Sequence, residues 1–303
     1  MNDAPAWIAV DWGTSSLRVW LMDAQGGVIR RHDSDQGMSR LGRADYEPAL
    51  LDLVGDALPD GTSVPVLVCG MAGSRQGWAE AAYAATPCKP PALSQATRVT
   101  TADPRLDVRI LPGIKQDRPA DVMRGEESQI AGVFARHPDF DGVVCLPGTH
   151  CKWVQVSAGE VVSFRTFMTG EIFALLSRHS VLRHSVDDGW DDDAFAESVA
   201  HALSRPAGLA ADLFTLRAEG LLHGLSPANA HARLSGLLIG LELAGARPYW
   251  LGQQVMVVGA TGIARAYSNA LAAQGLSPLQ TDAEDITLAG LTAAFTAHRE
   301  TTS

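Results

Sequence analysis

The sequence has few cysteines and no C-x-x-C pair. Four cysteines among 303 residues are too few for a disulfide scaffold of this size. We therefore expect reduced thiols. Cys69 and Cys145 lie in the apolar runs VPVLVC and GVVCLP, where a free thiol is typical of a small core residue.

Basic residues are also few, since 24 Lys and Arg stand against 34 Asp and Glu, a formal net charge of -10. This charge would repel phosphate backbones and anionic lipids, so we expect no nucleic acid and no membrane partner. Residues Met1 to Pro5 contain no basic segment before an apolar stretch, and the apolar windows at 236–246 and 255–260 are interrupted or too short to span a membrane. We therefore expect a cytoplasmic protein.

The remaining composition is that of a globular protein. At roughly 150 residues per domain, the length suggests about two domains. Hydrophobic residues make up 46% and charged residues 19%, which excludes a disordered or fibrous chain.

Two stretches of the sequence predict the same antiparallel meander. Residues 7–30 contain two strands around an Asp-x-Gly-Thr turn, then a Gly-Gly turn into a third strand. Residues 142–164 repeat this order, and an offset of 135 residues places Val19 on Val154. Such self-similarity indicates two related halves.

Strand and helix patterns alternate after each meander. The predicted helices cover residues 46–58, 120–136, 170–177, 193–203, 207–222, 230–243 and 285–298, and the predicted strands cover residues 64–69, 108–112 and 255–258. This order predicts an α/β fold with mixed sheets and a cleft between two halves, a common place for ligands.

The first meander's turn combines a carboxylate, a glycine and hydroxyl groups: Asp11, Gly13, Thr14, Ser15 and Ser16. Such a turn directs backbone N–H groups toward an anion, and Asp11 could hold a hydrated Mg²⁺. A single copy would be more typical of an ordinary hairpin turn.

The second meander repeats the turn as Gly148, Thr149 and His150, without the acid, and Lys152 follows as a cation that could face phosphate. In facing domains, two such turns would bind one phosphate chain, one of them with a metal anchor. This is what a single Mg-nucleotide requires.

A third glycine turn, Gly259-Ala260-Thr261-Gly262, joins an apolar strand to a helix. Alone it also resembles a dinucleotide fingerprint, with Asp282 at a suitable distance for the ribose. A nicotinamide enzyme is therefore an alternative. Against it, the first glycine-rich turn lacks the G-x-G-x-x-G spacing.

The order of DWGT, LPGTH and GATG resembles the phosphate 1, phosphate 2 and adenosine motifs of the sugar kinase, Hsp70 and actin superfamily. More specifically, DWGTSSLRVW, CGMAGSRQGW, VMRGEESQ, LPGTHCKW and FRTFMTGEIFALLSRHS resemble the 2-dehydro-3-deoxygalactonokinase family over nearly the whole chain. The resemblance implies ATP and Mg²⁺ as cofactors. It also implies phosphorylation of the 6-hydroxyl of 2-dehydro-3-deoxy-D-galactonate in galactonate catabolism.

The resemblance further implies two RNase H-like domains. The first would cover residues 1–137, joined by the C-terminal helix 285–303, and hold the phosphate 1 turn, the sugar acid and the catalytic acid. The second would cover residues 138–284 and hold the phosphate 2 turn and the adenosine motif.

The candidate general base lies in VMRGEESQ. This stretch resembles the Gly-Asp-Gln-Gln of related sugar kinases, whose aspartate is the base, so Glu126 matches that aspartate and Glu127 is the near alternative. Glutamate is one methylene longer, which changes its reach. Judged from the residues alone, the two acids are more typical of a helix start.

The substrate carboxylate calls for a guanidinium, which binds it through two parallel hydrogen bonds. Arg75, with Gln76 beside it, is the first candidate because its neighbours are small and polar. The alternatives are Arg165, Arg18 and Arg124.

Two other functions stay open: an ATP-switched binding module, and a phosphohydrolase similar to exopolyphosphatase, which the negative charge disfavours. The acidic run at 187–193 lacks the calcium-loop spacing, and His179 and His184 lack further zinc ligands, so we expect no structural metal. The sequence sets neither the substrate's configuration at C4 nor the oligomeric state, and a homodimer is compatible with it.

Overall fold

The computed structural model describes the backbone of residues 4–302 and the side chains of residues 4–297. Residues 1–3 of the N-terminal segment and residue 303 of the predicted C-terminal helix lie outside the described part. The chain forms two compact units. Unit 1 contains Met1–Phe140, Ser157–Ser163 and Ala283–Ser303, and unit 2 contains Asp141–Val156 and Phe164–Asp282.

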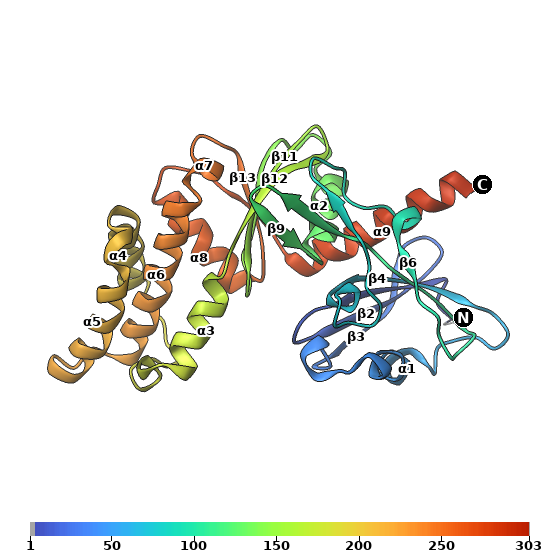
Figure 1. Cartoon of the computed structure of the whole chain (residues 1–303), viewed down its shortest axis with the longest axis horizontal. Coiled ribbons are helices and arrows are strands. Elements are labelled where there is room, and N and C mark those ends of the chain that lie inside the picture. Colours follow the sequence, from blue (N-terminus) through green and yellow to red (C-terminus); the bar gives the residue numbers. More distant parts are fainter. Residues whose placement is uncertain (1–3, 303) are drawn as a thin grey trace. The chain divides into compact units, whose positions relative to one another are not determined.

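Unit 1 is built on a six-stranded sheet of order β3-β2-β1-β4-β7-β6 (Figure 1). Its strands are β1 (Trp7–Trp12), β2 (Leu17–Met22), β3 (Val28–Ser34), β4 (Val64–Gly70), β6 (Thr97–Arg98) and β7 (Leu106–Ile110). β1, β2 and β3 pair antiparallel, which confirms the predicted meander, whereas β4 is parallel to β1 and β7.

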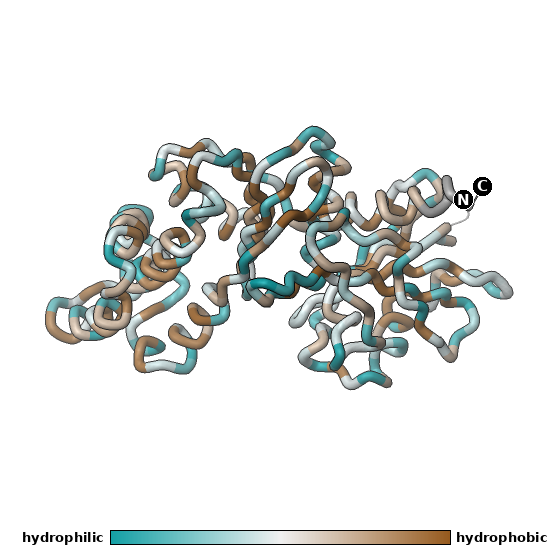
Figure 2. Tube along the Cα trace, turned by 45° about the horizontal axis from the view of Figure 1, so that its top comes forward, coloured by the Kyte–Doolittle hydropathy of each residue, from teal (hydrophilic) through white to brown (hydrophobic). Residues whose placement is uncertain are grey.

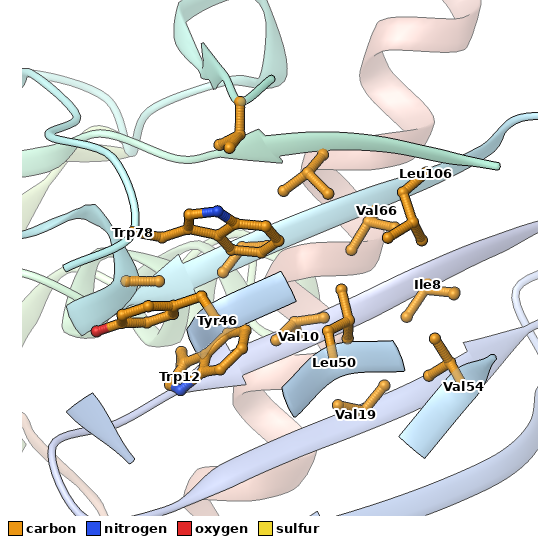
Figure 3. Packing of buried hydrophobic residues seen from close by; sticks show 14 of the residues in the cluster. Ile8, Val10, Trp12, Val19, Tyr46, Leu50, Val54, Val66, Trp78 and Leu106 are labelled. Carbon is orange, nitrogen blue, oxygen red and sulfur yellow. The ribbon is translucent and has the colours of Figure 1, made fainter. Parts of the chain in front are cut away.

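Helices cover both faces of this sheet because its strands carry apolar residues on both sides. α1 (Tyr46–Val54) packs on the face that presents Ile8, Val10 and Trp12. Figure 3 shows Trp12, Tyr46 and Trp78 together at one end of this core, and the rings of Trp12 and Tyr46 lie 4.7 Å apart. Aromatic contacts of this kind add to the stabilisation that burial alone provides.

The opposite face, which carries Trp7 and Ala9, is covered by α9 (Ala283–Thr302). The rings of Trp7 and Phe295 stack there at 4.3 Å. The last helix therefore completes the core of unit 1, although the rest of unit 2 separates it from that unit in the sequence.

α9 also crosses α2 (Glu126–Arg136) at two glycines, and the two helices lie side by side in Figure 1. A Cβ atom at Gly132 would lie 1.9 Å from the Ile286 carbonyl oxygen, and one at Gly290 would lie 1.8 Å from the Ser128 carbonyl oxygen. Only glycine fits at these two positions, so the crossing fixes α2 against α9.

Unit 2 repeats this plan with a five-stranded sheet of order β12-β11-β10-β13-β14, in which the first residues of β12 belong to the segment Ser157–Ser163 of unit 1. Its strands are β10 (Gly142–Leu146), β11 (Cys151–Ser157), β12 (Glu160–Phe167), β13 (Val255–Val258) and β14 (Leu279–Thr281). Val10 pairs with Val19 in unit 1 and Val144 with Val154 in unit 2, so the second hairpin loop has one more residue. The offset of 135 residues thus holds for the second strand of the hairpin but not for the first.

Six helices of unit 2 accompany this sheet: α3 (Thr169–His179), α4 (Asp192–Ser204), α5 (Leu209–Leu222), α6 (Pro227–Gly245), α7 (Arg247–Trp250) and α8 (Thr261–Ala272). α4, α6 and α8 pack on the strands through Phe195, Ile239 and Tyr267. Figure 2 shows hydrophobic and hydrophilic residues interspersed along the chain trace. More than half of the residues of α6 are buried, whereas none of those of α3 is fully buried. Among the described residues, no helix is both long and apolar enough to cross a membrane.

One predicted helix begins later than expected. Residues 120–123 form strand β9 (Ala120–Met123), antiparallel to β8 (Gly113–Asp117), and the helix begins only at Glu126. Gly125, with φ of 109°, makes the bend between them in a region of backbone space that favours glycine. β8 also pairs with β5 (Tyr83–Ala85), so a small third sheet that the sequence analysis did not predict precedes α2.

Candidate active site

The β1–β2 turn in unit 1 is held by backbone hydrogen bonds. The Gly13 N–H donates to the Ser16 carbonyl at 2.8 Å, and the Gly13 and Thr14 carbonyls accept from the N–H groups of Met38 and Ser39. Thr14 and Ser15 are exposed. Backbone hydrogen bonds thus fix the conformation of the turn, while Thr14 and Ser15 are exposed to solvent. An exposed turn of this kind can bind an anion.

Asp11 lies just before this turn and pairs with Arg18 across the hairpin. Its Oδ2 accepts from Arg18 Nη1 at 3.0 Å, and Cys69 Sγ lies 3.8 Å from Oδ1. Burial raises the pKa of Asp11, and the Arg18 guanidinium opposes that rise. Since Arg18 Nε also lies 3.8 Å from Glu284, two carboxylates already engage this arginine.

The two acids at the start of α2 have different environments. Glu127 is 1% exposed, and its two carboxylate oxygens accept the Gly125 N–H at 2.9 and 2.7 Å. Glu126 is half-buried, and its Oε2 accepts the Arg124 N–H at 3.0 Å. Burial, followed by the neighbouring charge of Glu126, raises the pKa of Glu127 to about 8. Glu126 is therefore the acid of this pair that a ligand in solution can reach.

The raised pKa of Glu127 makes stability depend on pH. The folded state binds the Glu127 proton more tightly than the unfolded state does. The free energy of unfolding therefore falls as pH rises from about 4.5, the ordinary pKa of Glu, to about 8. Glu127→Gln, which stays neutral, should therefore gain stability relative to the wild type by a few kcal/mol over that range, since one pKa unit corresponds to about 1.4 kcal/mol. Urea unfolding at several pH values measures this, and parallel pH curves for the two proteins would contradict it.

The first two arginine candidates are accessible. The side chain of Arg75 is 80% exposed and its Nε lies 3.4 Å from Glu80 Oε1, and Gln76 beside it is also exposed. Arg165 is exposed on β12. Arg75 and Arg165 can therefore reach a ligand in solution.

Arg124 is instead buried and engaged. Its guanidinium lies 4.3 Å from the centre of the Tyr83 ring and donates to the Ala81 carbonyl at 2.7 Å. It joins the loop after β4 to the start of α2, which is a structural contact.

In unit 2, the β10–β11 turn packs against the first turn of α3. The Glu171 N–H donates to the Thr149 carbonyl at 2.9 Å, and the His150 Nε2 lies 2.6 Å from a Glu171 carboxylate oxygen. Gly170 passes so close that a Cβ atom there would lie 2.2 Å from the Gly148 carbonyl oxygen. Gly148, Thr149 and His150 remain exposed.

Lys152 points into unit 2. Its side chain is 5% exposed, and Nζ donates to Thr166 Oγ1 on β12 at 2.8 Å. It therefore lies beneath the turn and not on its exposed side.

The β13–α8 turn places Ala260, Thr261 and Gly262 at the surface and buries Gly259. β13 lies between β10 and β14 in a sheet whose other half is an antiparallel meander. This topology is not the doubly wound parallel sheet of dinucleotide-binding domains, so the nicotinamide alternative does not fit the fold.

A cavity of about 320 Å³ in unit 2 adjoins two of these motifs. Gly148 of the β10–β11 turn and Gly262 at the start of α8 both line it. Its aromatic walls, which the sequence analysis missed, come from α3, α4, α6 and the loop before α4: Phe173, Phe195, His231 and Trp190. Among these rings, Phe173 and His231 lie 5.2 Å apart.

Within the described residues, no three His, Cys, Asp or Glu side chains are grouped so that they could hold a metal ion. Mg²⁺ usually keeps several waters and binds one or two carboxylates together with substrate phosphates. Asp11, a single carboxylate beside an exposed turn, fits that mode of binding.

Comparisons with known proteins agree on one family. The family model for 2-keto-3-deoxy-galactonokinase matches residues 11–294. A protein of Rhizobium meliloti named a probable 2-dehydro-3-deoxygalactonokinase is 41% identical over 97% of this chain and 98% of its own. The 2-dehydro-3-deoxygalactonokinase of Escherichia coli is 35% identical over 89% of this chain and 90% of its own.

A solved structure confirms the fold. The crystal structure of a Sinorhizobium meliloti protein, provisionally described as a 2-dehydro-3-deoxygalactonokinase, has a TM-score of 0.88 and 42% identity and covers 96% of each chain. The predicted two-domain α/β fold is thereby confirmed, as is the family resemblance. From its sequence and its fold, the chain belongs to the 2-keto-3-deoxy-galactonokinase family.

Proposed function

We propose that the protein transfers the γ-phosphoryl group of ATP to the 6-hydroxyl of 2-dehydro-3-deoxy-D-galactonate in galactonate catabolism. The products are 2-dehydro-3-deoxy-6-phospho-D-galactonate and ADP. The observation that carries this proposal is the family match over residues 11–294, together with the names of the relatives.

In this proposal the residues of the two hairpin turns bind the phosphate groups of ATP. Thr14 and Ser15 offer exposed hydroxyl groups in unit 1, where Gly13 and Ser16 complete the turn, and Gly148, Thr149 and His150 form the exposed turn of unit 2. Lys152 contributes positive charge from beneath the second turn. Asp11 would hold Mg²⁺ through water, and the ion would neutralise charge on the phosphates.

Glu126 is the proposed general base. It takes the proton of the 6-hydroxyl while that oxygen forms a bond to the γ-phosphorus, and the bond from this phosphorus to the bridging oxygen of ADP breaks. Its accessible carboxylate favours it over Glu127, which is buried and holds its proton up to about pH 8. Arg75, with Gln76, is the proposed ligand of the substrate carboxylate, and Arg165 is the alternative.

The cavity in unit 2 is the proposed nucleoside site. Aromatic walls provide surfaces on which a purine ring can stack, and the neighbouring turns at Gly148 and Gly262 would place the phosphates at its edge. We also propose a cytoplasmic location and the domain limits of 1–137 with 285–303, and 138–284.

The decisive experiment is an ADP-release assay with Mg-ATP across 2-keto-3-deoxy sugar acids and neutral sugars, followed by mass spectrometry of the product. We expect ADP release only with a 2-keto-3-deoxy acid, and a product phosphorylated at O6. Equal release without any acceptor would instead favour an ATP-hydrolysing module. Comparison of the galactonate and gluconate derivatives determines the preference at C4.

A further inference from the structure

Unit 2 contains a buried carboxylate that the proposed reaction does not use. Glu242 on α6 is 1% exposed. Its Oε1 accepts from Trp153 Nε1 at 2.8 Å, and its Oε2 accepts from the Tyr267 hydroxyl at 2.7 Å. The polar side chains of Thr169 and Cys151 also oppose the rise in its pKa. In the described part of the chain, Glu242 forms no ion pair with Lys, Arg or His.

Burying the Glu242 carboxylate lowers the stability of the fold, so stability by itself does not explain why this residue is here. Burial raises its pKa, and the neutral donors around it offset only part of the cost of removing the charge from water. A well-packed apolar side chain would often stabilise a core equally well or better. What the two hydrogen bonds from Trp153 and Tyr267 provide instead is a single fixed arrangement of the groups that donate them.

Three of the side chains around Glu242 also line the cavity in unit 2. Thr169, Cys151 and Tyr267 line it on the side that faces Glu242. They belong to α3, β11 and α8, which are the elements that adjoin the two glycine turns. The carboxylate therefore lies behind the cavity and joins the three elements that form it.

The network reaches the β10–β11 turn directly. The Tyr267 hydroxyl lies 3.0 Å from Cys151 Sγ, which in turn donates to the Gly148 carbonyl at 3.5 Å. Thr169 is the first residue of α3, whose first turn contacts the same hairpin turn through Glu171 and Thr149. Two series of polar contacts thus connect Glu242 to one turn.

We propose that Glu242 is a positioning residue for the nucleotide. Through Tyr267, Cys151 and Thr169 it holds the β10–β11 turn and the start of α3 in the geometry that the nucleoside and phosphates require. This inference rests on the proposed function, because it assumes that the cavity and its turn bind ATP.

The test compares Glu242→Gln and Tyr267→Phe with the wild type. Tyr267→Phe keeps the ring and removes only the hydroxyl that lies between Glu242 and Cys151. It therefore tests the positioning role even if Glu242→Gln does not fold. We expect the Kd for Mg-ADP by calorimetry and the KM for ATP to rise about tenfold, consistent with the loss of one or two buried hydrogen bonds. The KM for the sugar acid should stay nearly unchanged.

Trp250→Phe is the matched control. It removes another buried indole hydrogen bond of unit 2, from Trp250 Nε1 to the Leu243 carbonyl at 2.8 Å, at a residue that does not line the cavity. It should lower the melting temperature without changing the Kd for Mg-ADP. If Tyr267→Phe also loses only stability, the positioning role is wrong while the proposed function stands. If the wild type itself binds no nucleotide, both are wrong.

Discussion

Glu126→Gln is expected to lower kcat about 10²- to 10⁴-fold, the usual contribution of a general base, while the KM for ATP stays nearly unchanged. Glutamine keeps the size of the side chain and can still accept the Arg124 N–H through its amide oxygen. The fold of the β9–α2 bend should therefore persist. The variant loses only the group that removes the proton from the 6-hydroxyl.

Glu127→Gln is the control for this experiment, because the two acids are adjacent in the sequence and differ in environment. Glu127 is buried and, with a pKa of about 8, mostly protonated at neutral pH, so a neutral amide is close to its native state. We expect its turnover at pH 7 to be close to that of the wild type. A large loss in Glu127→Gln with normal turnover in Glu126→Gln would assign the base to Glu127.

The distinction between these two acids shows what the sequence could not provide. The motif Gly125-Glu126-Glu127 located the start of α2, yet no periodicity tells which acid faces the interior. That depends on the bend at Gly125, which follows a strand that the sequence analysis had assigned to the helix. Residues 120–123 form a strand of only four residues in a small sheet, too short for an alternating pattern to compete with a helical one.

The hairpins were predictable because their signals are local. Alternating apolar residues around glycine-containing turns define both meanders, and the register of each follows from the turn. The orientation of Lys152 was not predictable, since its partner Thr166 lies on the next strand of the sheet. The aromatic walls of the cavity were missed for the same reason, because Phe173, Trp190 and His231 come from separate segments whose local patterns are those of ordinary helices and loops.

The crossing of α2 and α9 is another contact between distant segments, and it gives the largest expected effect on stability. Gly290→Ala should lower the free energy of unfolding by about 3 kcal/mol. The added Cβ atom would lie 1.8 Å from the Ser128 carbonyl oxygen and 2.9 Å from the Gly132 nitrogen, so the helices must separate. Urea unfolding measures the loss.

Helix propensity acts in the opposite direction, which makes this prediction specific. Replacing glycine with alanine at a helix position where the added methyl group meets no neighbour stabilises the helix by about 1 kcal/mol. Gly220 on α5 is such a position, because the nearest atom to an added Cβ is the Ser185 hydroxyl at 3.9 Å. We therefore expect Gly220→Ala to gain stability and Gly290→Ala to lose it.

The crossing should also affect turnover, because α2 begins at Glu126. Separation of the helices should shift this proposed base, and Gly290→Ala should therefore lower kcat even where the protein is fully folded. A stable and fully active Gly290→Ala variant would show that the crossing neither supports unit 1 nor positions α2.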